Sequence, residues 1–441
     1  TTTQAPVVDK AQIAAQLEQV YADYWQANLA LNPINATFIG DTRYNDQMPN
    51  FFTAEFRQQA HDLNQSWLDK ALALKGEQLD GSARISYDIF VRERKLALEG
   101  ERFPTWMLPV DQFSSFAAFL PMLGSGSSAQ PFVTVKDYDN WLKRGAAIPA
   151  IFDQSIANMR EGMKAGVVQP KVLMNKVIPQ LDSIMNNDPE KTTFWGPIKN
   201  MPADFSAEDK KRLTDAYRTM IADGLMPAYQ RLRTFIAEEY LPVCRDTVAL
   251  SALPDGQAWY AFNAKTQTTT DLTPEQIHEI GLKEVARIHS EMQEVMKQVK
   301  FEGDLPAFFK FMTTNKQFEF KSEQALLEAY NGLRERIDKK IPEQFSVLPK
   351  AGFEIRPVES YRAESMAGGQ YFPPSEDGKR PGIFYVNAYD LPSRKIWDME
   401  DLYLHEAIPG HHFQIAIQQE LTDVPAFRRF GGETAFAEGW G

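Results

Sequence analysis

The chain has 441 residues, of which 43% are hydrophobic and 24% are charged, a balance typical of a globular protein with a sizeable core. Its 59 acidic and 47 basic residues give a formal net charge of −12, which argues against nucleic acid as the main partner. No apolar run reaches the roughly 18 residues that a transmembrane helix needs. The single cysteine, Cys244, excludes an intrachain disulfide, a cysteine-rich zinc site and an iron–sulfur cluster.

The first ten residues, TTTQAPVVDK, lack an initiator methionine and open with a short polar stretch. Such a start is typical of a mature exported protein whose signal peptide has been removed, although an artificially trimmed chain would look the same.

Helical patterns dominate the chain. Apolar residues from Ile13 to Tyr24 recur at spacings of three and four, which predicts a helix that ends before Asn32-Pro33. A longer stripe runs over residues 213–236, and Pro227 inside it should kink or divide that helix.

A strong helix start lies near the middle of the chain, where Thr273 is the expected N-cap, Pro274 the first helical residue and Gln276 the partner that completes a capping box. The apolar stripe of this helix is expected to be buried. It consists of Ile277, Ile280, Val285, Ile288 and Met292. No carboxylate pattern accompanies the two histidines near it, His278 and His289, so these are expected to be structural or to face solvent.

Between about residues 341 and 400 the helical periodicity is lost, and the residues from Gly382 to Tyr389 predict a strand. The sequence therefore predicts a mainly α protein with a small β-sheet next to a helix that carries histidines. Three regions are expected: a helical N-terminal region at 1–250, a helical middle region at 251–340, and a strand–helix region at 341–441.

A histidine block near the end of the chain is the strongest functional signal. Three of the six histidines, His405, His411 and His412, fall within eight positions, and Glu406 follows the first. The block looks like the zinc-protease motif H-E-x-x-H, except that Pro409 stands where the second histidine should be.

In an unbroken helix neither His411 nor His412 could share an ion with His405, because i+6 points to another side and i+7 lies about 10.5 Å along the axis. Pro409 removes a backbone donor, however, and Gly410 accepts unusual backbone angles. We therefore expect a two-residue bulge that returns His411 to His405, with His412 as the alternate.

A third ligand would come from the segment ETAFAEGW, which offers Glu433 and Glu438. Glu438-Gly439-Trp440 resembles the Glu-Gly-Phe segment that supplies the third zinc ligand in gluzincin aminopeptidases. This resemblance favours Glu438 as the ligand and Glu433 as a supporting or alternate residue.

The segments HEAIPGHHFQ and EGW resemble the bacterial domain-of-unknown-function family 885, which comprises zincin-like, mostly helical proteins and includes lipoproteins. LPDGQAWY, DLTPEQIHEIGLKEVARI and DGKRPGIFYVN are also similar to that family, so the resemblance covers roughly residues 250–440. It implies a gluzincin-type zincin architecture, metallopeptidase activity and a place in the bacterial cell envelope or periplasm, with a lipid anchor upstream of residue 1. Members of the family usually continue beyond EGW, so we expect this chain to be truncated at its C-terminal end.

The resulting hypothesis is a zinc-dependent hydrolase of peptide bonds. His405, His411 and Glu438 would hold Zn²⁺, and Glu406 would act as general base on the metal-bound water. An open edge of the strand Gly382–Tyr389 would receive an extended peptide. Candidate substrate contacts on it are Tyr385, Asn387 and Tyr389.

Two alternatives remain at this stage: an inactive zincin-derived envelope binding protein, and a metal-dependent amidase or esterase that acts on small molecules.

Overall fold

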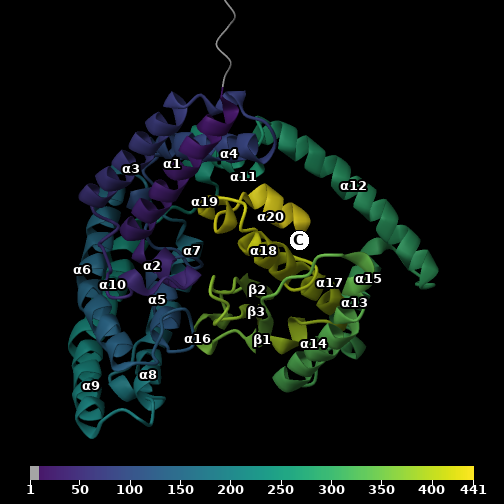
Figure 1. The fold of residues 1–441 in the computed structure, drawn as a ribbon. Helices are drawn as coiled ribbons and strands as arrows, with labels where there is room; N and C mark the ends of the chain where they lie inside the picture. Colours follow the sequence, from purple (N-terminus) through teal and green to yellow (C-terminus); the bar gives the residue numbers. More distant parts are fainter. Residues whose placement is uncertain (1–8) are drawn as a thin grey trace, which may run out of the picture. The chain divides into compact units, whose positions relative to one another are not determined.

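The computed structural model describes residues 9–441, so the first eight of the ten N-terminal residues that suggested an exported protein lie outside it. Helical segments hold 67% of the chain, whereas the three strands hold only 5, 4 and 5 residues, which confirms the prediction of a mainly helical protein (Figure 1).

Contacts divide the chain into two compact units. Unit 1 comprises Thr1–Pro254, Ser375–Arg380 and Leu421–Gly431, and unit 2 comprises Asp255–Pro374, Pro381–Glu420 and Gly432–Gly441.

Unit 1 is built from helices. They are α1 (Lys10–Leu31), α2 (Pro33–Ile39), α3 (Ala54–Ala73), α4 (Gly81–Gly100), α5 (Phe116–Gly124), α6 (Val135–Ala165), α7 (Lys171–Ile184), α8 (Gly196–Lys199), α9 (Ala207–Thr219), α10 (Met226–Phe235) and α19 (Ala426–Arg429). The first predicted helix is confirmed as α1, which ends before Asn32. Its apolar stripe buries Leu17, Tyr21 and Tyr24 against residues of α3 and α4, because these side chains recur on one face of the helix.

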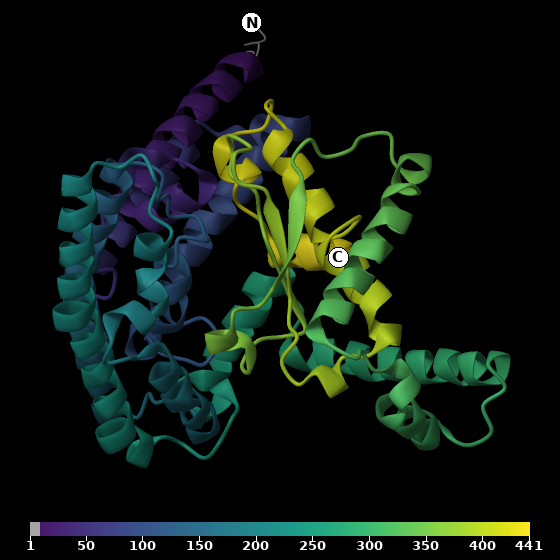
Figure 2. The same cartoon turned by 90° about the horizontal axis from the view of Figure 1, so that it is seen from below.

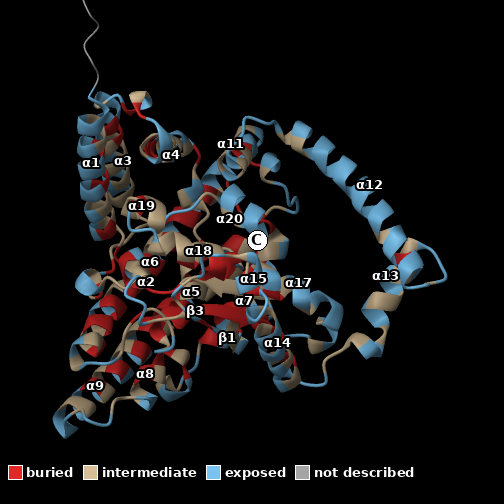
Figure 3. Ribbon diagram, turned by 45° about the vertical axis from the view of Figure 1, so that its right-hand side comes forward, coloured by how far each residue is buried: buried red, intermediate tan, exposed pale blue. Residues whose placement is uncertain are grey.

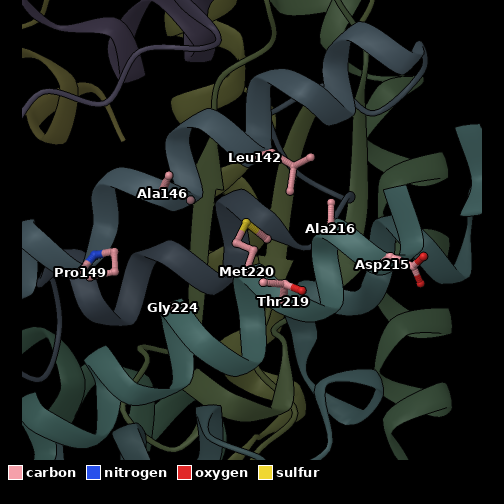
Figure 4. Close-up of a pocket in the computed structure, with 9 residues that line it drawn as sticks. Leu142, Ala146, Pro149, Asp215, Ala216, Thr219, Met220 and Gly224 are labelled. Carbon is pink, nitrogen blue, oxygen red and sulfur yellow. The ribbon is translucent and has the colours of Figure 1, made fainter. Parts of the chain in front are cut away.

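Pro227 divides the second predicted helix, as expected. A π-helical segment, Met220–Leu225, separates α9 from α10, because the proline has no N–H with which to continue the regular ladder. An open hollow of about 470 Å³ lies between this segment and α6 (Figure 4). It is lined by Leu142, Gly145, Ala146, Pro149, Asp215, Ala216, Thr219, Met220 and Gly224, and none of these is a predicted site residue.

Unit 2 combines helices with the sheet. Its helices are α11 (Gly256–Thr268), α12 (Pro274–Gln298), α13 (Leu305–Thr314), α14 (Glu323–Asp338), α15 (Ile341–Gln344), α16 (Ser360–Ala363), α17 (Ile396–Glu406), α18 (His411–Glu420) and α20 (Thr434–Trp440). Its strands are β1 (Phe353–Pro357), β2 (Gly369–Phe372) and β3 (Gly382–Val386), all inside the region where strands were predicted. The sheet lies beside α17 and α18, drawn in yellow in Figure 2.

The strand order is β1-β3-β2, with β1 parallel and β2 antiparallel to β3. The expectation that Gly382–Tyr389 presents an open edge is therefore wrong: β3 is the central strand, and both of its edges are paired. All five of its residues are buried, as a strand covered on both faces requires.

Helix α12 begins as predicted but packs differently. The Thr273–Gln276 capping box is present, with bonds of 2.9 and 3.2 Å. The expected burial of its stripe is wrong, because Ile280 and Val285 are 49% and 50% exposed, and Met296 is the one buried residue of the helix. Figure 3 shows α12 in pale blue, the colour of exposed residues, over most of its length. Among the described residues α12 packs mainly on α11 and α13 near its ends, so little covers its apolar face.

Across residues 9–441, no helix combines the length and the apolar character that a membrane crossing needs.

Candidate metal centre

The predicted interruption of the histidine helix is present. Helix α17 ends at Glu406, Ala407 leaves helical geometry with φ −105° and ψ −104°, and α18 begins at His411. A Cβ on Gly410 would collide with the backbone carbonyl groups of Leu404 and His405. The chain therefore folds back so tightly over the end of α17 that only glycine fits at this position.

This turn brings three predicted ligands together in unit 2. One ligand atom from each of His405, His411 and Glu438 lies within 4.8 Å of the other two. The imidazole rings of the two histidines are 4.5 Å apart between centroids. Glu438 Oε2 lies 3.6 Å from His405 Nε2 and 3.5 Å from His411 Nε2. The prediction that His411 returns to His405 is thus met in the structure.

The donor types of the three groups and the two separations from Glu438 are compatible with a zinc ion. Two ligands that approach zinc tetrahedrally at about 2.0–2.1 Å are about 3.3 Å apart, close to the two separations from Glu438. Two imidazoles and one carboxylate, with a fourth position left open, form a donor set that catalytic zinc sites use. Burial, together with the neighbouring His405, lowers the pKa of His411, which favours the neutral imidazole that binds a metal.

Glu406 lies beside this group without belonging to it. Its side chain is buried, with 8% exposure. Burial raises the pKa of Glu406 and the nearby Glu438 adds to the effect, while His405 opposes it. A carboxylate with a raised pKa is a better proton acceptor, which suits the general-base role predicted for it.

Helix α20 carries Glu438 and is tied to the turn by Trp440. The indole Nε1 of Trp440 donates a hydrogen bond of 2.7 Å to the carbonyl oxygen of Pro409. Glu433, the other predicted candidate, is the N-cap residue of α20 and does not join the ligand group.

His412 points away from His405 and into the protein. Its Nε2 lies 3.0 Å from the carbonyl oxygen of Ala351, and its Nδ1 lies 2.9 Å from the hydroxyl of Tyr371. Only 1% of the residue is exposed, and burial lowers the pKa of His412 to about 4. The structure therefore places His411, and not the alternate His412, in the ligand group.

The predicted substrate contacts are mostly inaccessible. Tyr385 and Asn387 are 3% and 0% exposed, and the Asn387 side-chain amide donates to the carbonyl groups of residues 363, 366 and 367. Tyr389 alone of the three is exposed. The prediction that Tyr385 and Asn387 contact substrate required an open edge of β3. Both edges of β3 are paired with neighbouring strands.

Two other side-chain types offer no competing site. Cys244 is buried, and burial raises its pKa to about 11, so the thiol stays protonated at neutral pH. His278 and His289 are exposed on α12, as expected.

Residues 33–441 match the model of a family described as "Bacterial protein of unknown function (DUF885)". The chain belongs to this family. The match includes most of the N-terminal helical half, beyond the part where the sequence motifs pointed to the family.

Two solved structures resemble this DUF885 protein. The putative lipoprotein from Colwellia psychrerythraea aligns with a TM-score of 0.85 at 23% identity, over 98% of this chain and 76% of the other. A putative lipoprotein of unknown function from Shewanella oneidensis aligns with a TM-score of 0.62 at 14% identity, over the same shares. At these identities the likeness concerns the fold alone. None of the curated proteins compared with the chain matches it significantly.

Proposed function

We propose that this DUF885 protein is a zinc-dependent hydrolase that cleaves peptide bonds. The observation that carries the proposal is the convergence of His405, His411 and Glu438 on one point, with the buried Glu406 next to them. A zincin-like, gluzincin-type arrangement is part of this proposal: the two histidines flank a helix break, and the third ligand would come from a separate helix, α20.

Each side chain has a distinct task in this scheme. The neutral imidazoles of His405 and His411 and the Glu438 carboxylate would hold Zn²⁺. Zinc held by these residues would supply an acidic water and would polarise the carbonyl group of the substrate. Glu406 takes a proton from the attacking water and delivers it to the nitrogen of the leaving amine, so its raised pKa helps the first transfer without preventing the second.

The location of the protein follows from its relatives only by analogy. Both solved structures are of proteins described as putative lipoproteins. We therefore propose that this chain also acts in the bacterial cell envelope, held by a lipid anchor upstream of residue 1. Its substrates would then be peptides or small amides that reach that compartment.

The test is zinc content together with hydrolysis of a panel of peptides and esters, for the wild-type protein and for Glu406→Gln. Glutamine keeps the size of the side chain but accepts no proton, so this variant should retain one equivalent of zinc and lose peptide hydrolysis by at least about a hundredfold. Zinc binding without any hydrolysis by the wild-type protein would favour an envelope binding protein, and turnover of esters alone would favour a small-molecule esterase. A wild-type protein that binds no zinc would refute the proposal.

A further inference from the structure

His412 connects the helix that bears the second proposed ligand to the sheet of unit 2. It directly follows His411 at the start of α18, yet it is almost fully buried. Its ring packs on the ring of Phe353 in β1 at 4.7 Å between centroids and meets the ring of Tyr371 in β2 edge-on at 5.6 Å. One side chain thus touches both outer strands.

The hydrogen bonds of His412 specify which nitrogen carries the proton. A carbonyl oxygen can only accept, so Nε2 donates to Ala351, whose carbonyl lies just before β1. The neutral ring then leaves Nδ1 as an acceptor, and the Tyr371 hydroxyl donates to it. Both nitrogens are occupied, one by a partner just before β1 and the other by a partner in β2, which fixes the position and the rotation of the ring.

The third strand also shapes this contact. A Cβ on Gly382, the first residue of β3, would lie 2.8 Å from the Tyr371 hydroxyl and 2.9 Å from His412 Nδ1. The central strand therefore leaves room for this hydrogen bond only because glycine stands there. At the other end of α18, Glu420 accepts hydrogen bonds from the backbone N–H groups of Lys350 and Ala351 at 2.7 and 3.1 Å. The segment before β1 is thus held to α18 at two points.

We propose that His412 is a positioning residue of the metal centre, which locks α18 against the sheet so that His411 presents its Nε2 to His405 and Glu438. The role rests on the zinc site proposed above. His411 sits at the first residue of α18, directly after a four-residue break, so no regular helix precedes it to fix its direction. The buried ring of the following residue is therefore a support that can fix the direction of His411 from within α18.

Three variants separate the two hydrogen bonds. His412→Leu removes both, His412→Gln keeps an N–H donor near the position of Nε2 for the Ala351 carbonyl, and Tyr371→Phe keeps the histidine and removes only the hydroxyl. Leu326→Ala is the control, because Leu326 is buried in the same core cluster as Phe353, so its truncation costs packing there while both hydrogen bonds of His412 are kept.

The measurements are zinc affinity, by competition with a chromophoric chelator, and the visible absorption spectrum of the Co²⁺-substituted protein, which reports ligand geometry. We expect His412→Leu to weaken zinc binding about 10–100-fold and to change the Co²⁺ spectrum. His412→Gln and Tyr371→Phe should each lose less, and Leu326→Ala should leave the affinity and the spectrum of the folded protein unchanged.

Unaltered affinity and spectra in Tyr371→Phe and in whichever His412 variants fold would overturn the positioning role while leaving the zinc site standing. Equal losses in Leu326→Ala would also overturn it, because the effect would then be general destabilisation. Absence of zinc binding by the wild-type protein would instead refute the proposed function itself.

Discussion

Acid should destabilise the metal-free protein through His412. Burial lowers the pKa of His412 from 6.5 to about 4, so the unfolded chain binds a proton at this residue over a range where the folded chain does not. Stability then falls as pH falls, by about 1.4 kcal/mol per pH unit. Over the two and a half units between these pKa values, the loss amounts to about 3 kcal/mol. Above pH 6.5 both states are neutral at this residue, and its ionisation contributes nothing.

The comparison that isolates this effect is wild type against His412→Gln, both treated with a chelator. Urea unfolding at pH 7, 5.5 and 4.5 would give the free energy of unfolding of each protein, and the transition that reports unit 2 should be used if the two units unfold separately. Glutamine has no proton to gain, so the stability advantage of wild type should shrink by about 2–3 kcal/mol between pH 7 and pH 4.5. Carboxyl groups, including Glu406 with its opposite, raised pKa, titrate in both proteins and largely cancel in the difference.

A stability difference that stays constant from pH 7 to pH 4.5 would refute this reasoning. It would mean that His412 can be protonated in the folded state near its ordinary pKa. The ring between Ala351 and Tyr371 would then not be excluded from water. A difference that grows toward low pH would reverse the sign of the argument.

Three further substitutions test other parts of the structure. Gly410→Ala should destabilise the protein by about 2 kcal/mol or more and weaken zinc binding, as measured by urea unfolding and chelator competition, because its Cβ meets the His405 carbonyl; an unchanged affinity would contradict the tight turn. Glu438→Ala should weaken zinc binding at least about tenfold more than Glu433→Ala does, and the opposite order would move the ligand role to Glu433. Ile288→Ser on the exposed face of α12 should change the free energy of unfolding by less than about 0.5 kcal/mol, and a larger loss would show that this face is covered.

Features that depend on a few neighbouring residues were predictable from the sequence. The Thr273 capping box and the helix division near Pro227 need only local backbone chemistry, and both are present. The break between His405 and His411 belongs to the same class, because proline and glycine limit the backbone wherever they stand.

Features that depend on distant partners were not predictable in the same way. The sequence pattern correctly predicts a strand at Gly382–Val386. Its central position, however, results from pairing with segments 353–357 and 369–372, and the pattern of one strand does not reveal which segments pair with it. The stripe of α12 shows the same limit, since a period of 3.6 residues reveals an apolar face without saying that anything covers it.

The interruption after Glu406 explains why the adjacent residues His411 and His412 point to different partners. In a continuous helix, His411 would point to another side and His412 would lie about 10.5 Å along the axis from His405, so neither could share an ion with it. The break resets that phase, so that α18 starts anew with His411 directed at His405 and Glu438. Successive residues of a helix point about 100° apart, which turns His412 from the ligand group toward the sheet. The same reset therefore brings one histidine to the proposed ligand group and its neighbour to the sheet, and a regular H-E-x-x-H helix would have no equivalent of that pair.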